Sequence, residues 1–250
     1  MKQLKRIPVL SGLCAGLGLV CLLLRQWLLS TGLDEKGLLL PGQPAATLVW
    51  VMTASVCALL VWVFFTWQKH TTCLFPGTAL SAVATLFLIL GYTLVIWQQL
   101  LRPMSLLALV TCVFGAVSVL CMALVAWGQF RGQRMHPLLY CSNVFFQLVF
   151  LLLQYPLWSR EAQPQEHLFQ TVACAGMLIT VFCRAELAAG KISGRNYTVF
   201  SRGTLFFSVA AVAHCNQPLL YLCFALYILL DGCHLHYKQP KTEQPQEQGE

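Results

Sequence analysis

Charged residues are scarce in this sequence. Asp, Glu, Lys and Arg make up 10% of its 250 residues and hydrophobic residues make up 58%, whereas charged residues form roughly 25% of an ordinary soluble domain. Uncharged stretches of about 18 residues or more recur along the chain, which is more apolar surface than one soluble core would bury. The shortage of charge excludes a soluble protein. It predicts an all-α, polytopic membrane protein whose main partner is the lipid bilayer, with no nucleic-acid partner.

Several chemical signatures are missing as well. No CxxC pair occurs, and most of the 12 cysteines lie inside apolar runs, so they predict small hydrophobic residues rather than a disulfide framework or a zinc site. The chain has no GxSxG, HExxH or Walker loop, and it lacks the deep carboxylates that proton relays use. We therefore assign no catalytic residue, no metal ion and no cofactor from the sequence.

Seven segments have the length that a transmembrane helix needs, which is about 20 residues for roughly 30 Å of hydrocarbon. They are residues 9–30, 45–67, 78–100, 104–127, 138–158, 168–189 and 204–230. Prolines stand at or just before several of the predicted starts, where the missing N–H is tolerated. We expect one transmembrane domain over residues 1–237. The segment 238–250 is rich in Gln, Glu, Pro and Lys, and it predicts a disordered polar tail.

The Lys and Arg residues indicate the orientation, because basic residues in short loops stay on the cytoplasmic side. If the N-terminus is inside, ten of the 16 lie in inner segments: Lys2, Lys5, Arg6, Lys69, Arg131, Arg134, Arg184, Lys191, Arg195 and Arg202. Five lie in outer segments: Lys36, Arg102, Arg160, Lys238 and Lys241. This asymmetry predicts an N-terminus inside and a C-terminus outside. Compact loops without sorting signals indicate the plasma membrane of a bacterium.

Polar side chains mark one face of the fifth predicted span. Asn143, Gln147 and Gln154 follow one another at intervals of four and seven residues, which places all three on one side of a helix. That side is expected to face protein or water rather than lipid. Two interpretations stay open: hydrogen bonds between helices, and a stripe that lines a substrate path.

The most polar cluster within a long apolar run lies in the last predicted span. His214, Asn216 and Gln217 precede Pro218, about 15 Å into the span at 1.5 Å per residue. Pro218 removes a backbone hydrogen bond, so we expect a kink near the middle of the bilayer, where transporters often bind ligands. We predict a site for a small polar ligand made of His214, Asn216 and Gln217 with Gln147 and Asn143. The other interpretation is a kink satisfied by neighbouring side chains.

Other charged and polar residues are expected at the interfaces. Arg25 should extend toward the outer surface, near Asp34 or Glu35, and Arg184 should lie at the inner interface with Glu186. At the end of the last span the metal-capable residues Asp231, Cys233, His234 and His236 follow closely. Because two histidines spaced by two point in different directions on a helix, solvated interface residues are favoured over a metal site.

Small residues recur at intervals of four on the first two spans. Gly12 with Gly16, and Ala54 with Ala58, are typical of close helix contacts. Packing within the bundle is favoured, and a helix-mediated membrane partner is the alternative. The oligomeric state stays open.

These patterns favour a multi-pass membrane protein that carries a small molecule or ion, or that forms the ligand-binding membrane part of a transport system. The polar site would lie at the broken seventh span. A structural or assembly protein without a ligand is the alternative. An intramembrane enzyme or receptor that uses His214 is the third interpretation, because a lone histidine lacks an acid or nucleophile beside it.

Overall fold

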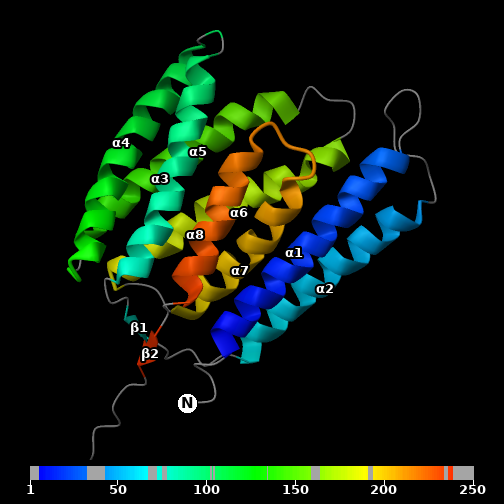
Figure 1. The fold of residues 1–250 in the computed structure, drawn as a ribbon, viewed down its shortest axis with the longest axis horizontal. Helices are drawn as coiled ribbons and strands as arrows, with labels where there is room; N and C mark the ends of the chain where they lie inside the picture. Colours follow the sequence, from blue (N-terminus) through cyan, green and yellow to red (C-terminus); the bar gives the residue numbers. More distant parts are fainter. Residues whose placement is uncertain are drawn as a thin grey trace, which may run out of the picture.

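The structure, a computed structural model, describes residues 6–32, 43–66, 72–74, 78–101, 103, 105–133, 135–158, 164–190, 194–233 and 236–238. In these ranges the chain forms helices α1 to α8 and strands β1 and β2 (Figure 1). The helices are α1 Arg6–Thr31, α2 Pro44–Thr66, α3 Ala79–Leu100, α4 Leu106–Phe130, α5 Pro137–Trp158, α6 Pro164–Ala188, α7 Gly194–Ala211 and α8 Pro218–Cys233. The strands are β1 Thr72–Leu74 and β2 His236–Lys238.

Helices α1 to α6 match the first six predicted spans, and all six are long and apolar enough to cross a membrane. Their first residues follow from local chemistry. Pro44, Pro137 and Pro164 occupy first helical positions, where proline costs no hydrogen bond. Thr78 and Ser81 form a capping box before α3, which satisfies two backbone N–H groups that the helix leaves free. The helical part of the prediction is confirmed, since the described residues form a helical bundle, and six long apolar helices are consistent with the predicted polytopic membrane protein.

The prediction of one seventh span over 204–230 is wrong. The chain forms two antiparallel helices there, because α7 ends at Ala211 and α8 begins at Pro218. Pro218 does not kink a continuous helix. It starts a new one, at the position where proline is most favoured, and it disfavours helical geometry in the residue before it. α7 also begins at Gly194, ten residues earlier than predicted, in a segment whose polar residues had suggested a loop.

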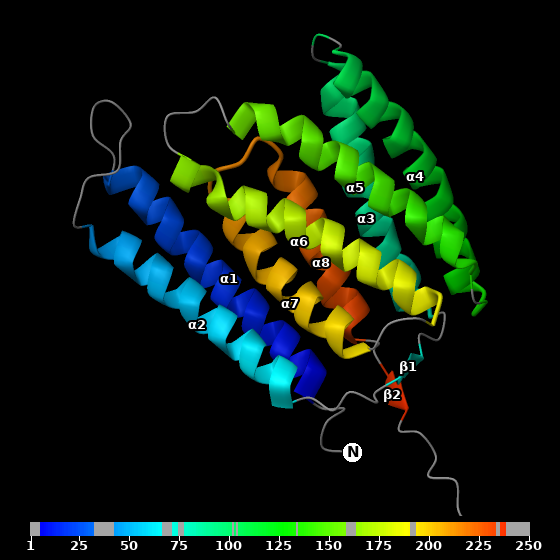
Figure 2. The same ribbon diagram turned by 180° about the vertical axis from the view of Figure 1, so that it is seen from behind.

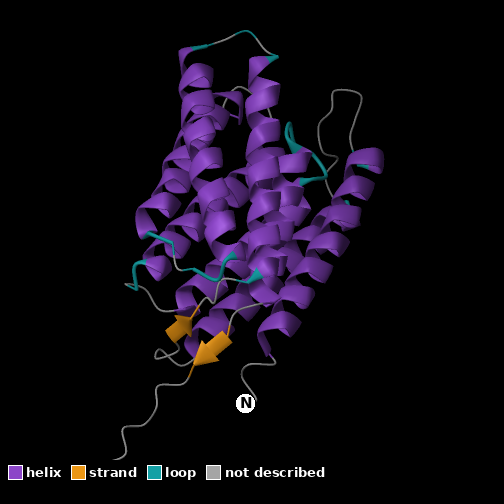
Figure 3. Cartoon of the chain, turned by 60° about the vertical axis from the view of Figure 1, so that its left-hand side comes forward, coloured by secondary structure: helices purple, strands orange, loops and turns teal. Residues whose placement is uncertain are grey.

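This hairpin changes which ends of the chain lie together. The start of α1 and the end of α8 lie at the same end of the bundle (Figure 1), and Figure 3 shows both strands there as well. β1, which follows α2, pairs antiparallel with β2, which follows α8, with Cys73 opposite Tyr237. The prediction that the first helix begins and the last helix ends on opposite sides is therefore wrong. Lys238, counted as an outer residue above, lies at the end where α1 begins. Of the predicted tail 238–250, residues beyond Lys238 lie outside the described residues.

α7 is the central helix of the bundle. It packs against α1, α2, α6 and α8, with the α1–α2 hairpin on one side and α3, α4 and α5 on the other (Figures 1 and 2). Most of its side chains are buried, the polar ones included: Tyr197, Thr198, Ser201, Arg202, Thr204 and Ser208. Polar residues avoid lipid by turning toward the interior of a helix bundle. The neighbouring helices shield α7 from the bilayer, so it can contain many polar residues. A search for apolar segments therefore does not detect it.

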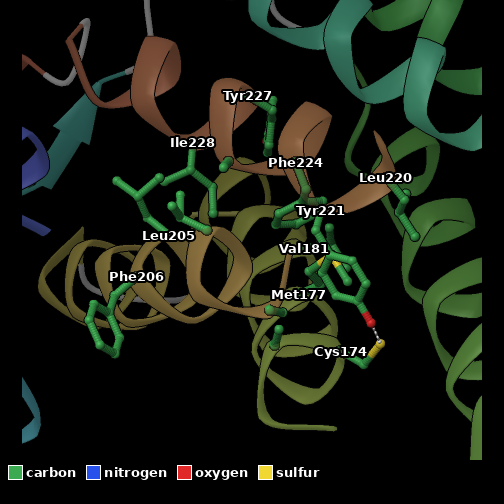
Figure 4. Close-up of a cluster of buried hydrophobic side chains, with 14 of the residues drawn as sticks. Cys174, Met177, Val181, Leu205, Phe206, Leu220, Tyr221, Phe224, Tyr227 and Ile228 are labelled. Carbon is green, nitrogen blue, oxygen red and sulfur yellow. Dashed lines mark hydrogen bonds between the residues drawn. The ribbon is translucent and has the colours of Figure 1, made fainter. Parts of the chain in front are cut away.

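An apolar core joins α6, α7 and α8. Met177 and Val181 of α6 belong to this core together with Leu205 of α7 and Phe224 of α8, whereas Phe206 of α7 points away from them (Figure 4). The helices come close where small residues allow it: a Cβ added at Gly176 would lie 2.6 Å from the Thr204 hydroxyl oxygen. These contacts fix the positions of the polar groups described below.

The predicted small-residue motifs do not take part in this packing. Gly12 and Gly16 are exposed on α1, and a Cβ added at either would meet no atom within 4 Å. Ala54 and Ala58 are exposed on α2. The expectation that these residues pack inside the bundle is wrong, because α2 uses a different face, formed by Val49, Val56, Leu60 and Val63.

Candidate functional site

The turn between α7 and α8, residues 212–217, lies inside one end of the bundle. The Arg25 guanidinium donates a hydrogen bond to the Ala210 carbonyl over 2.7 Å, and the Gln170 side chain donates to the His214 carbonyl. Arg25 precedes Thr31 by six residues in α1, and Gln170 follows Pro164 by six in α6. At 1.5 Å per residue both lie about 9 Å inside the ends of their helices. The turn is recessed by the same amount, and it is not at the middle of the bundle as predicted.

Arg25 closes the carboxyl end of α7. The last carbonyls of a helix lack partners within it and carry the negative end of the helix dipole, so a guanidinium is well suited to this place. The Arg25 side chain is 5% exposed, and its guanidinium carbon lies 4.4 Å from the centre of the Phe169 ring. The expectation that Arg25 extends toward the surface is wrong. Asp34 and Glu35, its predicted partners, lie outside the described residues.

His214 faces α6 across the recessed turn. Its ring centre lies 5.7 Å from that of His167, which is buried on the first turn of α6. Gln217 is buried as well, and its Oε1 atom accepts no hydrogen bond from the described residues. Asn216 is exposed. Of the three residues predicted in this turn, His214 therefore lies beside His167 and Gln170, Gln217 is buried in the same turn, and Asn216 is exposed.

Asn143 and Gln147 lie elsewhere, among α3, α4 and α5. Gln147 donates a hydrogen bond to the Tyr92 hydroxyl over 3.0 Å, and Asn143 donates to the Met122 sulfur over 3.2 Å. Gln154 is also buried, so the predicted protein-facing side of α5 is confirmed. Gln147 occupies the middle of α5, whereas His214 lies near one end of the bundle. The expected common depth of these two residues is wrong.

A second buried polar cluster lies at the opposite end of the bundle. Arg184 of α6 forms an ion pair with Asp231 of α8 over 3.3 Å, and the Tyr197 hydroxyl of α7 donates to the same carboxylate over 2.6 Å. Both charged side chains are at most 5% exposed. The Arg184 guanidinium also faces the rings of Tyr140 and Tyr197 at 5.7 and 5.8 Å. Three helices are held together here by one charge pair and its hydrogen bond.

Arg184 lies near the end of its span as predicted, but it is buried rather than at a solvated interface, and the predicted outer, solvated position of Asp231 is wrong. With one helix over 204–230 the two residues fall on opposite sides of the membrane, so no pairing could be expected. The α7–α8 hairpin brings them to the same end. Among the described residues, no three His, Cys, Asp or Glu side chains gather as a metal site would need. His234 lies outside those residues.

Comparisons with known proteins add no name to these sites. The chain matches no family model, no curated protein and no solved structure. Its function has to be argued from the positions and chemistry of the buried polar groups.

A third buried cation, Arg202, lies halfway along α7. It is the largest fully buried side chain among the described residues. Its Nη1 atom donates to the Ser201 hydroxyl over 2.7 Å, and its Nε and Nη2 atoms have no hydrogen-bond partner among those residues. Sequence reasoning placed Arg202 just before the last span, as one of the inner basic residues. The available signal was its position among the small and aromatic residues of "SRGTLFF", which is unusual for a cytoplasmic loop.

Proposed function

We propose that this protein is a membrane carrier for a small polar molecule, or the ligand-binding membrane part of such a carrier. The observation that supports the proposal is the recessed turn between α7 and α8. It places His214, Gln217, Gln170 and the Arg25-capped end of α7 about 9 Å inside the ends of α1 and α6. We further propose the plasma membrane of a bacterium as its location, because the connections between the helices are short.

Two helix ends meet at this turn. In the proposed function, the backbone carbonyls at the end of α7 and the backbone N–H groups at the start of α8 would bind the polar ligand. Irregular backbone occurs at membrane depth only where protein or a water-filled cavity surrounds it. Carriers use such interruptions because helix ends and freed backbone groups replace the water around a ligand. Here α7 presents its carboxyl end and α8 its amino end. The buried Gln217 oxygen adds an acceptor that the described residues leave unused.

For Asn143 and Gln147 we propose a packing role, since each bonds to a neighbouring helix. Asn216, exposed next to Gln217, would lie at the entrance of the ligand site. The alternative of an intramembrane enzyme has one observation in its favour, the 5.7 Å approach of the His167 and His214 rings, because two imidazoles at this distance can share a proton through a water molecule.

The proposal is tested with purified protein in detergent, by following thermal unfolding through tryptophan fluorescence with amino acids, sugars, nucleosides and carboxylic acids. A ligand that binds only the folded state raises the unfolding temperature. We expect at least one compound to do so with the wild type, and His214→Leu to lose the response while it still folds. His136→Leu is the matched control, because His136 is exposed.

A compound that passes this screen is then tested for uptake into vesicles that contain the protein. Uptake by the wild type and none by His214→Leu would support a carrier. If the stabilising compound is instead converted to a product that depends on both His167 and His214, the protein is an enzyme. If no compound stabilises the wild type, and His214→Leu only changes its stability, the structural interpretation replaces the proposal.

A further inference from the structure

Arg202 lies where a polar side chain is most costly and least expected. It occupies the ninth of the 18 residues of α7, so it lies about 14 Å below Ala211 at the recessed end of the helix. Its side chain is 0% exposed, and α1, α2, α6 and α8 surround α7. A headgroup at the membrane surface cannot reach this depth, so lipid does not supply a partner for the charge.

The described part of the chain supplies no opposite charge to Arg202 either. No described Asp or Glu lies within ion-pair distance of its guanidinium. Asp231, the buried carboxylate, is engaged by Arg184 and Tyr197 at the end of the bundle. A buried charge persists in a folded protein when it is paired and hydrogen-bonded. The position of Arg202 therefore calls for an anion that is not part of the described chain.

The unused atoms of Arg202 define the geometry of that anion. Nη1 is held by the Ser201 hydroxyl over 2.7 Å, which orients the planar group. The two remaining nitrogens, Nε and Nη2, have no hydrogen-bond partner among the described residues and form one edge of the guanidinium. Two parallel N–H donors on one edge match two oxygens of a carboxylate.

We propose that Arg202 is the binding residue for a small monocarboxylate in the middle of the bundle. One guanidinium charge balances one carboxylate charge, whereas a dianion such as phosphate would leave one negative charge buried. The Cys14 thiol of α1 is buried close enough to interact with the Arg202 charge, and a weakly polar side chain of this kind suits the hydrocarbon part of such a ligand. The inference that a carboxylate binds here follows from these contacts and does not depend on the proposed function. Only the use of this site in transport depends on that function.

Three buried guanidinium groups lie along α7, from the recessed turn to the opposite end of the bundle. Arg25 contacts Ala210 near one end of α7, Arg202 lies at its middle, and Arg184 faces Tyr197 near the other end. They are spread over 13 residues of α7, which is about 20 Å. Asp231 neutralises one of the three. Arg202 has no carboxylate partner among the described residues, so an anion that enters from the recessed turn would meet a positive charge at the middle of the helix.

The test uses the full chain in detergent with formate, acetate, butyrate and benzoate at constant ionic strength. The neutral amide of each acid and sodium chloride serve as controls. At least one carboxylate should raise the unfolding temperature of the wild type, and its amide should not. Arg202→Met should abolish this response, and Arg202→Lys, which keeps the charge but loses the planar edge, should raise the dissociation constant about tenfold or more. Arg131→Met, at an exposed arginine over Trp127, should respond as the wild type does.

The result that would overturn the inference is a response that persists in Arg202→Met, or a wild type that distinguishes no carboxylate from its amide. If Arg202→Met does not fold, the affinity of Arg202→Lys decides, and an unchanged dissociation constant overturns the inference. The outcome is separate from that of the carrier proposal. A carboxylate response that requires Arg202 but not His214 would support this site and count against a ligand site at the turn. A response that requires His214 but not Arg202 would overturn this site and leave the carrier proposal standing.

Discussion

Replacing Asp231 by Asn should destabilise the protein by about 3–5 kcal/mol, the usual cost of leaving one partner of a buried ion pair without the other. The Arg184–Asp231 pair has the burial that this estimate requires, since neither side chain is more than 5% exposed. Asn keeps the volume and an oxygen that can still accept from Tyr197, whose hydroxyl bonds to the carboxylate over 2.6 Å. The change therefore isolates the loss of the negative charge next to Arg184.

The assay is reversible unfolding in mixed micelles, followed by tryptophan fluorescence. Glu186→Gln is the matched control, because Glu186 lies two residues from Arg184 on the same helix and is only half-buried; its effect should stay within about 0.5 kcal/mol. The variant with Arg184→Met, Asp231→Leu and Tyr197→Phe should be close to the wild type or more stable, since it replaces the buried pair by apolar residues of similar size and also removes the Tyr197 hydroxyl that would lose its acceptor. An Asp231→Asn variant within about 1 kcal/mol of the wild type would refute this reasoning.

Two glycine substitutions test the packing of the bundle. Gly176→Ala should destabilise the protein by about 1–3 kcal/mol, because its Cβ would lie 2.6 Å from the Thr204 hydroxyl oxygen where α6 meets α7, and unfolding in mixed micelles measures the loss. Gly12→Ala should leave stability within about 0.5 kcal/mol of the wild type, because nothing lies within 4 Å of the added carbon; a loss as large as that of Gly176→Ala would show that α1 packs against a partner on this face.

Much of the fold follows from hydrophobic length alone. The six spans from α1 to α6 were predicted because each is an apolar run of membrane length, and their first residues follow from proline and capping chemistry. The face of α5 that carries Asn143, Gln147 and Gln154 was predicted from helical periodicity, and all three are buried. These are properties of single helices, which the local sequence determines.

The errors arise where the neighbours of a helix decide its environment. α7 carries Arg195, Asn196 and Arg202 within its first half, and a polar segment of this kind has no signal for a span. Its burial depends on four other helices. Once α7 was missed, the polar residues 214–217 were interpreted as a kink rather than a turn between two helices, and Arg184 and Asp231 were assigned to different sides. Arg184 and Asp231 pair because the α7–α8 hairpin brings them to the same end of the bundle. The sequence around either residue alone does not indicate this pairing.

The central claim is that α7 and α8 form a hairpin whose turn opens toward the end of the bundle opposite to both strands. Single cysteines at positions 216 and 237, each on a cysteine-free background, test it directly in sealed vesicles of known orientation with a membrane-impermeant maleimide. Asn216 is exposed beside the recessed turn, and Tyr237 lies in β2. The account predicts that position 216 reacts from one side of the membrane and position 237 from the other, with position 73 on the side of 237. A continuous helix would leave position 216 unreactive from both sides and would separate position 237 from position 73, and that result would contradict the account.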